Sequence, residues 1–283
     1  MTMASQVTLE FASLSDTGKV RSGNEDAVAV APALKLAILA DGMGGYNAGE
    51  VASGMACALL KNELETALAV QGGVSWQAST GPDGSTPEAP PGHKMLYQAI
   101  ARTNSAIFQL AQSQNQYTGM GTTLVLTIFH GAEITVAHLG DSRLYLLRNK
   151  QLSQITSDHS VLQAQIDAGI LTPEQAKHSQ NKNLVTRALG IEADVQPEIH
   201  THDTVAGDLY LLCSDGLSDM LDDQELQSIL QSCGHELQLC ASQLIAAANH
   251  NGGRDNVSAV LIKVVSLTQP RLSPMARFLN WLK

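Results

Sequence analysis

The chain has 283 residues, of which 44% are hydrophobic and 16% charged, and its formal net charge is −10. This apolar content is enough for a sizeable core and excludes a disordered chain. The excess of acidic residues, 27 against 17 basic ones, argues against general nucleic-acid binding, which depends on clustered positive charge.

The beginning of the sequence carries neither a basic region nor a long apolar run, so we expect no signal peptide. No segment reaches the roughly 18 apolar residues that span a bilayer. The four cysteines (Cys57, Cys213, Cys233 and Cys240) form no C-x-x-C pair and have no histidine at zinc spacing. We therefore expect free, mostly buried thiols and a location in the cytoplasm, a reducing compartment.

Short strand-like runs alternate with amphipathic helices along the chain. The apolar, partly β-branched runs predict strands over 34–40, 122–129, 133–138, 144–147, 208–213 and 257–265. Helical periodicity predicts helices over 51–69, 93–111 and 236–248. Several strand-like runs are only a few residues apart, which indicates antiparallel hairpins.

Two segments stand outside this alternation. Residues 72–92 are rich in Gly, Pro, Ser and Thr, which predicts a flexible surface insertion between two helices. Residues 272–283 have the pattern of a short basic amphipathic helix. That helix could dock on its own domain, on a membrane or on a partner.

Three carboxylates occupy similar places relative to strand-like runs. Asp41 follows one apolar run and precedes a glycine. Asp215 follows another run and also precedes a glycine, and Asp255 stands just before the last run. Strand ends can converge at one edge of a stacked sheet, where clustered anions need a cation. Oxygen ligands suit hard ions such as Mg²⁺ or Mn²⁺, and a glycine lets a backbone carbonyl approach a metal closely.

A further charged group lies near the start of the chain. Arg21 precedes Glu25 by four residues and Asp26 by five. A guanidinium can bind a phosphate with two hydrogen bonds, and the acids can hold metal-bound water. A surface salt bridge in a loop is the alternative interpretation of this spacing.

Other phosphate and hydrolase chemistries do not match the sequence. The pattern G-x-G-x-x-G fails at Asn47, and no Gly-Lys-Ser/Thr follows the glycines as in a Walker A loop. No arginine stands six residues after any cysteine, as a cysteine-based phosphatase would need. The sequence also contains no H-E-x-x-H zinc motif and no G-x-S-x-G nucleophile elbow.

Eight segments, taken together and in order, resemble the PP2C (PPM) family of protein phosphatases, in its bacterial type. They are SDTGKVRSGNEDA (15–27), LAILADGMGG (36–45), MGTTLV (120–125), HLGDSRLYLLR (138–148), TSDHS (156–160), NLVTRALG (183–190), LLCSDGLSDML (211–221) and GGRDNVSAVL (252–261). The resemblance implies an α+β fold, a four-layer α-β-β-α sandwich of two antiparallel sheets flanked by helices. It implies one phosphatase domain over 1–266 and a tail over 267–283.

The resemblance also implies the roles of the acidic residues. Asp41 would bridge two metal ions and Gly42 would supply a carbonyl ligand. Asp215 and Asp255 would complete the first ion. Glu25 and Asp26 would act at the second ion, directly or through waters. Asp141, with Asp215, would hold a third, looser ion. Arg21 would bind the phosphate.

The segment 160–183 resembles the mobile flap that borders the substrate in this family. His159 and Ser160 lie at its base, where His159 could contact the substrate or only hydrogen-bond nearby. Tyr46 stands where many bacterial relatives have a histidine, and Met43 where some eukaryotic members carry one. The general acid is therefore left open between a metal-bound water and Tyr46, whose phenol donates reluctantly near neutrality.

The resemblance implies hydrolysis of phosphoserine and phosphothreonine by a water activated by two Mn²⁺ or Mg²⁺ ions, without a covalent intermediate. The expected partners are phosphorylated proteins, including a cognate serine/threonine kinase and its substrates, and we expect a monomer. Two alternatives are a catalytically silent phosphoprotein-binding module and a regulatory protein recruited through its tail.

Overall fold

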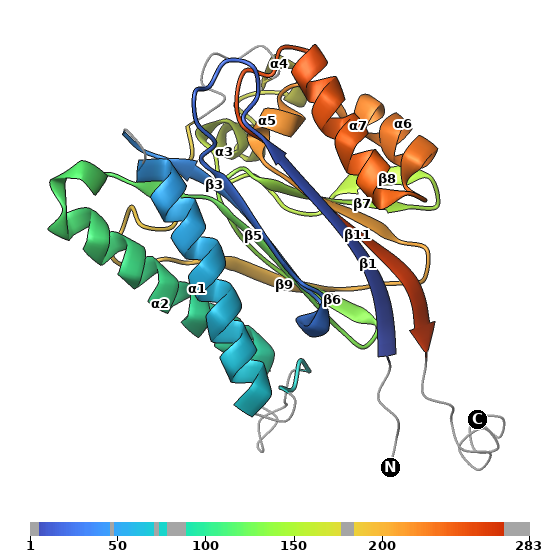
Figure 1. The fold of residues 1–283 in the computed structure, drawn as a ribbon, viewed down its shortest axis with the longest axis horizontal. Helices are drawn as coiled ribbons and strands as arrows, with labels where there is room; N and C mark the ends of the chain where they lie inside the picture. The colour runs from blue at the N-terminus through green and yellow to red at the C-terminus, as the bar shows by residue number, and fades with distance from the viewer. Residues whose placement is uncertain (1–5, 46–47, 71–73, 78–88, 177–183, 269–283) are drawn as a thin grey trace.

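The structure is a computed structural model that describes residues 6–45, 48–70, 74–77, 89–176 and 184–268. Two antiparallel sheets lie face to face between layers of helices (Figure 1). Successive side chains of a strand point to opposite faces of its sheet. In each sheet one face packs on the other sheet and the opposite face packs on helices, so both faces carry apolar side chains. The predicted α-β-β-α sandwich is confirmed.

The first sheet contains both ends of the described chain. Its strands, in spatial order, are β1 (Gln6–Asp16), β11 (Val257–Thr268), β10 (Leu209–Cys213), β7 (Arg143–Arg148) and β8 (Gln151–Gln154). The helices α5 (Asp215–Ser218), α6 (Asp223–Cys233) and α7 (Leu237–His250) accompany this sheet. Apolar side chains of these helices form one core with the outer faces of β1, β10 and β11.

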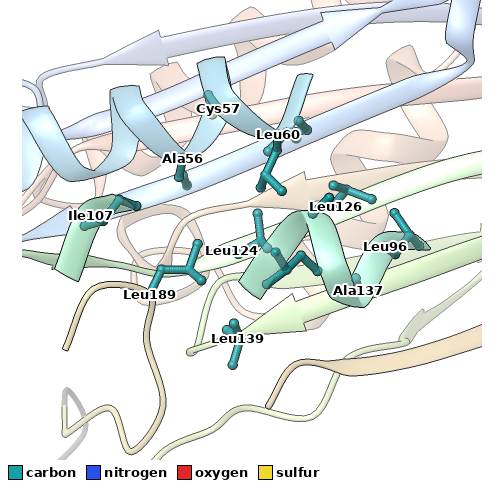
Figure 2. Close-up of a cluster of buried hydrophobic side chains, with 14 of the residues drawn as sticks. Ala56, Cys57, Leu60, Leu96, Ile107, Leu124, Leu126, Ala137, Leu139 and Leu189 are labelled. Atoms are coloured by element: carbon teal, nitrogen blue, oxygen red, sulfur yellow. The ribbon is translucent and has the colours of Figure 1, made fainter. Parts of the chain in front are cut away.

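The second sheet lies beneath the longest helices. Its strands, in spatial order, are β2 (Asp26–Ala31), β3 (Leu36–Met43), β5 (Leu124–His130), β6 (Glu133–Leu139) and β9 (Glu198–Asp203), with the short β4 (Gly121–Thr122) beside β3. The helices α1 (Ala48–Val70) and α2 (Pro91–Ser113) cover it. Figure 2 shows Leu60 of α1, Leu96 of α2 and Leu126 of β5 in their common core, and all three are fully buried.

A third core fills the space between the sheets. Leu39 of β3, Val136 of β6, Tyr210 of β10 and Val260 of β11 belong to it. The remaining elements are the short helices α3 (Val161–Asp167) and α4 (Pro173–Ala176) and the 3-10 turns Pro32–Leu34 and Asn115–Tyr117. No described helix has the length and apolarity that crossing a membrane requires.

The insertion expected over 72–92 is only partly outside regular structure. Gly92 lies in the first turn of α2, and its backbone N–H donates to the carbonyl of Ser75 at 2.9 Å. Val74 and Trp76 pack against the core under α1 and α2, and the Trp76 ring stacks on His130 at 4.3 Å. These contacts correct the expectation for the ends of the segment, whereas 78–88 lie outside the described residues.

The strand β11 continues through Thr268, where the described part of the chain ends. The helix expected over 272–283 therefore lies outside the described residues. The expected flap contains α3 and α4, and its residues 177–183 are likewise not described. All four cysteine thiols are free and buried, as expected.

Candidate metal centre

The carboxylates predicted from distant parts of the sequence line one cavity of about 230 Å³, the carboxylate cavity. Asp41 lies near the end of β3, Asp215 begins α5 directly after β10, and Asp255 precedes β11. These positions come together because β10 and β11 are neighbours in one sheet and the end of β3 faces them from the other. Also lining the cavity are Arg21, Glu25, Gly42, Met43, Gly44, Thr123, Asp141 and Val185.

Asp26 is not among the residues that line this cavity, but it is the neighbour of one of them. In the pairing of β2 with β3 it is directly opposite Asp41, an arrangement of like charges that is destabilising without a counterion. Its Oδ2 accepts a hydrogen bond from Ser214 Oγ at 2.8 Å. Its Oδ1 is buried and has no hydrogen-bond partner among the residues that the structure describes. An unpartnered buried carboxylate oxygen beside a second carboxylate fits a cation site.

The electrostatics of the cluster agree with this interpretation. Burial raises the pKa of Asp41 well above its usual range, and the neighbouring carboxylates Asp26 and Asp215 raise it further. Burial, and then the charges of Asp141 and Asp219, raise the pKa of Asp215 to about 8. Burial is also the main cause of a pKa of about 6 for both Asp26 and Asp141. Shifts in this direction are those of buried carboxylates clustered with like charges, and a bound cation would reverse them.

The glycine that follows each of two cluster aspartates is required by close approach of other backbone. A Cβ on Gly42 would overlap the carbonyl of Gly49 at the start of α1, and one on Gly216 would overlap the carbonyl of Asn256. Close packing of the protein itself therefore demands these glycines, a reason different from the expected approach to a metal.

Arg21 belongs to the rim of the cavity. Its Nη2 donates to Asp255 Oδ2 at 2.7 Å, and its side chain is 52% exposed. The guanidinium therefore reaches both the cluster and solvent, where an arriving anion could bind. The surface salt bridge considered for this arginine exists, but its partner is Asp255 and not one of the nearby acids in sequence.

Asn256 fixes the segment that carries Arg21 and Glu25. Its Oδ1 accepts from the backbone N–H of Glu25 at 2.8 Å, and its Nδ2 donates to the carbonyls of Thr17 and Gly23 at 3.0 and 2.9 Å. Sequence reasoning noted Asn256 only as the neighbour of Asp255. The backbone pairing role could not be seen in the sequence because its partners are more than two hundred residues away.

Asp219 is the other residue that sequence reasoning missed. It is exposed, and its charge raises the pKa of both Asp141 and Asp215. The signal was its position four residues after Asp215, since this spacing puts two side chains on the same face of a helical turn.

His159 and Ser160 do not line the carboxylate cavity. The Oγ of Ser160 accepts from the N–H of Gln163 at 3.1 Å and caps α3. His159 is buried and stacks on His138. Its backbone N–H donates to the carbonyl of Gly140 at 2.9 Å, beside Asp141. Tyr46 lies outside the described residues.

A second group of potential metal ligands surrounds these histidines. Ligand atoms of His138, His159 and Glu198 lie within 4.8 Å of one another. However, Nε2 of His138 donates to the carbonyl of Ser157 at 2.9 Å. Nδ1 of His159 accepts from the N–H of Gly140 at 3.3 Å, and its Nε2 lies 3.4 Å from both Glu198 Oε2 and Arg187 Nη1. Both ring nitrogens of His159 and Nε2 of His138 thus have hydrogen-bond partners, and of the ring nitrogens in this group only Nδ1 of His138 is buried without one among the described residues. A single free ring nitrogen is too little for a metal centre, and we assign this group to hydrogen bonding.

Comparison with known proteins adds an independent line of support. The model of the family "Protein phosphatase 2C" matches residues 19–251. The serine/threonine protein phosphatase PstP of Mycobacterium tuberculosis is 37% identical over 272 residues, covering 95% of this chain. This chain spans about half of that relative's length, 48%. The serine/threonine phosphatase stp of Listeria monocytogenes is 36% identical over 251 residues, covering 88% of this chain and 93% of that relative.

Solved structures agree with the sequence comparison. A crystal structure of M. tuberculosis PstP has a TM-score of 0.78 at 38% identity and covers 91% of this chain and 99% of its own. The catalytic domain of PstP in complex with two manganese ions has a TM-score of 0.76 at 38% identity, covering 92% and 100%.

Proposed function

The chain belongs to the protein phosphatase 2C family, and from this premise we propose that it hydrolyses phosphoserine and phosphothreonine in proteins with the help of divalent cations. The observation that carries the proposal is the convergence of Asp41, Asp215 and Asp255 on one cavity with Arg21 at its rim. The family relationship and the manganese complex of a 38% identical structure support the same activity.

The donor set fits two hard cations. Asp41 would be a ligand of both ions, and the carbonyl of Gly42 would be a ligand of one. Asp215 and Asp255 would complete the ligand set of the first ion. Glu25 and Asp26 would act at the second. All these ligands are oxygens, which suits Mn²⁺ and Mg²⁺, and both ions complete their coordination with water. When bound, such ions offset the charge of the phosphate and lower the pKa of water enough to supply a nucleophile.

A third cation would be held by Asp141 together with Asp215. Asp219 joins this pair in our proposal, because its charge acts on both carboxylates. The exposure of Asp219 agrees with a looser ion that exchanges readily.

The residues of the chain have separate tasks in the reaction. Arg21 exchanges part of its pairing with Asp255 for the phosphoryl oxygens and offsets their charge as the phosphorus–oxygen bond breaks. Asn256 keeps Arg21 and Glu25 in place through the backbone of their segment. Val185 and Met43 add apolar residues to the lining of the cavity. The proton for the leaving serine or threonine oxygen comes from water or from Tyr46.

The test is hydrolysis of phosphoserine, phosphothreonine and phosphotyrosine peptides by the purified chain with Mn²⁺, Mg²⁺, Ca²⁺ or a chelator. We expect turnover of the first two peptides with Mn²⁺ or Mg²⁺ and none with the chelator. Binding of the same peptides without release of phosphate, at any metal concentration, would instead support the phosphoprotein-binding alternative. The intact set of acidic ligands favours the enzyme.

Three finer assignments are part of the proposal. A serine/threonine kinase and its substrates as partners rest on fold-level analogy, and co-purification with a metal-ligand variant would test them. A monomer is expected, which light scattering would measure. A reducing compartment such as the cytoplasm is supported by the four free, buried thiols.

A further inference from the structure

A groove continues from the carboxylate cavity across the surface. It has a volume of about 770 Å³ and shares Asp141 and Asp215 with the carboxylate cavity. It runs between the base of the expected flap at α3 and α4 and the segment that contains α5 and the start of α6. A protein chain that places a phosphorylated side chain in the carboxylate cavity therefore has its neighbouring residues beside this groove.

The two walls of the groove differ chemically. One wall carries four exposed acidic residues, Asp219, Asp222, Asp223 and Glu225. The opposite wall carries the apolar side chains of Leu162, Ile166 and Ala176. We call this surface, with its acidic and its apolar wall, the acidic groove.

Within the described part of the chain, no basic side chain forms an ion pair with the acidic wall. Among the described residues that line the acidic groove, the one basic side chain is Arg143. Its guanidinium donates three hydrogen bonds, of 2.9, 3.1 and 2.7 Å, to the carboxylate of Asp158. Arg143 is therefore committed to its own partner. Asp222 and Glu225 accept hydrogen bonds from backbone N–H groups at the start of α6, but both side chains are exposed and neither is paired with a described basic residue.

Lysine and arginine side chains match both walls. Each has an apolar stem that can pack on Leu162 and Ile166 while its charged head meets the carboxylates opposite. An acidic segment would meet like charges there, and a short neutral side chain would gain little. The net charge of −10 also favours the approach of a basic segment over long range.

We propose that the acidic groove binds basic residues next to the phosphorylated residue, so that the preferred substrates are phosphoproteins with lysine or arginine near the phosphorylation site. This inference rests on the proposed phosphatase function and adds the substrate class. The carboxylates of the acidic wall that act here are Asp222, Asp223 and Glu225, because Asp219 is assigned to a cation.

The experiment compares matched phosphothreonine peptides with the Mn²⁺-loaded chain. One series places arginine at each position within about four residues of the phosphothreonine, since an extended chain advances ~3.3 Å per residue, and its partner series places glutamine there. We expect kcat/KM to be about tenfold higher for the best arginine peptide at low salt, and the preference to shrink with added salt, because several exposed ion pairs contribute weakly and are screened. The small ester p-nitrophenyl phosphate reports the carboxylate cavity alone.

The groove variant combines Asp222→Asn, Asp223→Asn and Glu225→Gln. These changes remove charge and keep the helix start, because Asn still caps a helix and Gln still completes the capping box that Asp222 and Glu225 form. The matched control combines Glu10→Gln, Glu65→Gln and Glu236→Gln, three exposed acids that line neither cavity. We expect the groove variant to lose most of the arginine preference and the control to keep it.

Equal kcat/KM for the two series at low salt, with p-nitrophenyl phosphate still hydrolysed, would overturn the inference, as would an equal loss of preference in the control. Absence of hydrolysis of every substrate would instead contradict the proposed function. Anisotropy with fluorescent, unphosphorylated forms of the peptides still tests the groove in that event, and tighter binding of the arginine peptide to the parent chain than to the groove variant is the expected result.

Discussion

Two groups of potential metal ligands lie in the same molecule, and they differ in how much negative charge they gather. At the carboxylate cavity, Asp26 is paired opposite Asp41 across neighbouring strands, and one oxygen of Asp26 has no partner among the described residues. The pKa of Asp215, which lines the cavity, is raised to about 8. In the histidine group, Nε2 of His138 and both ring nitrogens of His159 have hydrogen-bond partners, and the atom that lacks one among the described residues is a ring nitrogen, Nδ1 of His138, and not a carboxylate oxygen. The ligand atoms of the histidine group lie within 4.8 Å of one another, yet the carboxylates are the ones that lack compensation. Proximity of ligand atoms is therefore a weaker sign of a cation site than uncompensated charge.

Removing one carboxylate of the cavity should give the largest effect. We expect Asp215→Asn to lower kcat/KM with Mn²⁺ at least ~10³-fold, as loss of a group that controls transition-state charge does. Isothermal titration should also show weaker Mn²⁺ binding. Asp194→Asn, an exposed change that lines neither cavity, is the control and should leave both measurements unchanged. Substantial activity of folded Asp215→Asn would refute the assignment.

Removing the side chain that holds Arg21 and Glu25 in place should have the next largest effect. Asn256→Ala loses three hydrogen bonds to backbone groups, which we expect to lower the free energy of unfolding by about 2–3 kcal/mol. The apparent Kd for Mn²⁺ should rise about tenfold, the equivalent of ~1.4 kcal/mol. Asn251→Ala, which loses a single exposed bond to Met220, is the matched control. An unchanged Kd for Mn²⁺ in Asn256→Ala would contradict the positioning role.

The pH dependence of stability should reveal the uncompensated charges. The folded-state pKa values of Asp26, Asp141 and Asp215 are raised to about 6, 6 and 8, above the value of about 3.9 for an unfolded aspartate. The folded state therefore binds more protons between these values, and its stability falls as pH rises through that window. We expect the Tm of the chelated protein to fall by at least ~4 °C between pH 5 and pH 9.

Added Mn²⁺ should reverse that loss, because a cation offsets the same charges. Chelated Asp215→Asn should lose less stability over the same pH range than the parent chain. A Tm of the chelated parent chain that rises with pH would show that the carboxylates are compensated in some other way.

A change in the histidine group should have the smallest effect. Glu198→Gln removes a half-exposed acceptor near His159 and His138, which we expect to alter the free energy of unfolding by no more than ~1 kcal/mol. Mn²⁺ stoichiometry should stay the same in isothermal titration. Loss of one bound metal equivalent in this variant would mean that the histidine group binds a cation after all.

The sequence predicted the elements with continuous apolar character. The strands β3, β5, β6, β10 and β11 were predicted to within a few residues at most boundaries, and so were the helices α1, α2 and α7. The strand β9 was missed because its sequence EIHTHD is polar. The strand β1 was missed because serine, threonine and glutamate interrupt its apolar residues. The helix α6 was missed although Asp222 and Glu225 form a capping box, a signal that the sequence contains.

The site shows a similar division. Asp41, Asp215 and Asp255 could be proposed from their places at strand ends, because strand ends gather at an edge of the fold. The opposition of Asp26 to Asp41 could not be predicted, since it depends on the register of two strands. The positions of His159 and Ser160 away from the carboxylate cavity depend on how the loop before α3 packs on Gly140, which local sequence does not encode.

The central claim is that carboxylates without compensation inside the protein hold the cations of the reaction. Anomalous difference maps from crystals of the chain grown with Mn²⁺ test it most directly. The account predicts two strong peaks in the carboxylate cavity beside Asp41, with none at Glu198. An empty carboxylate cavity at saturating Mn²⁺, or peaks confined to the histidine group, would contradict it.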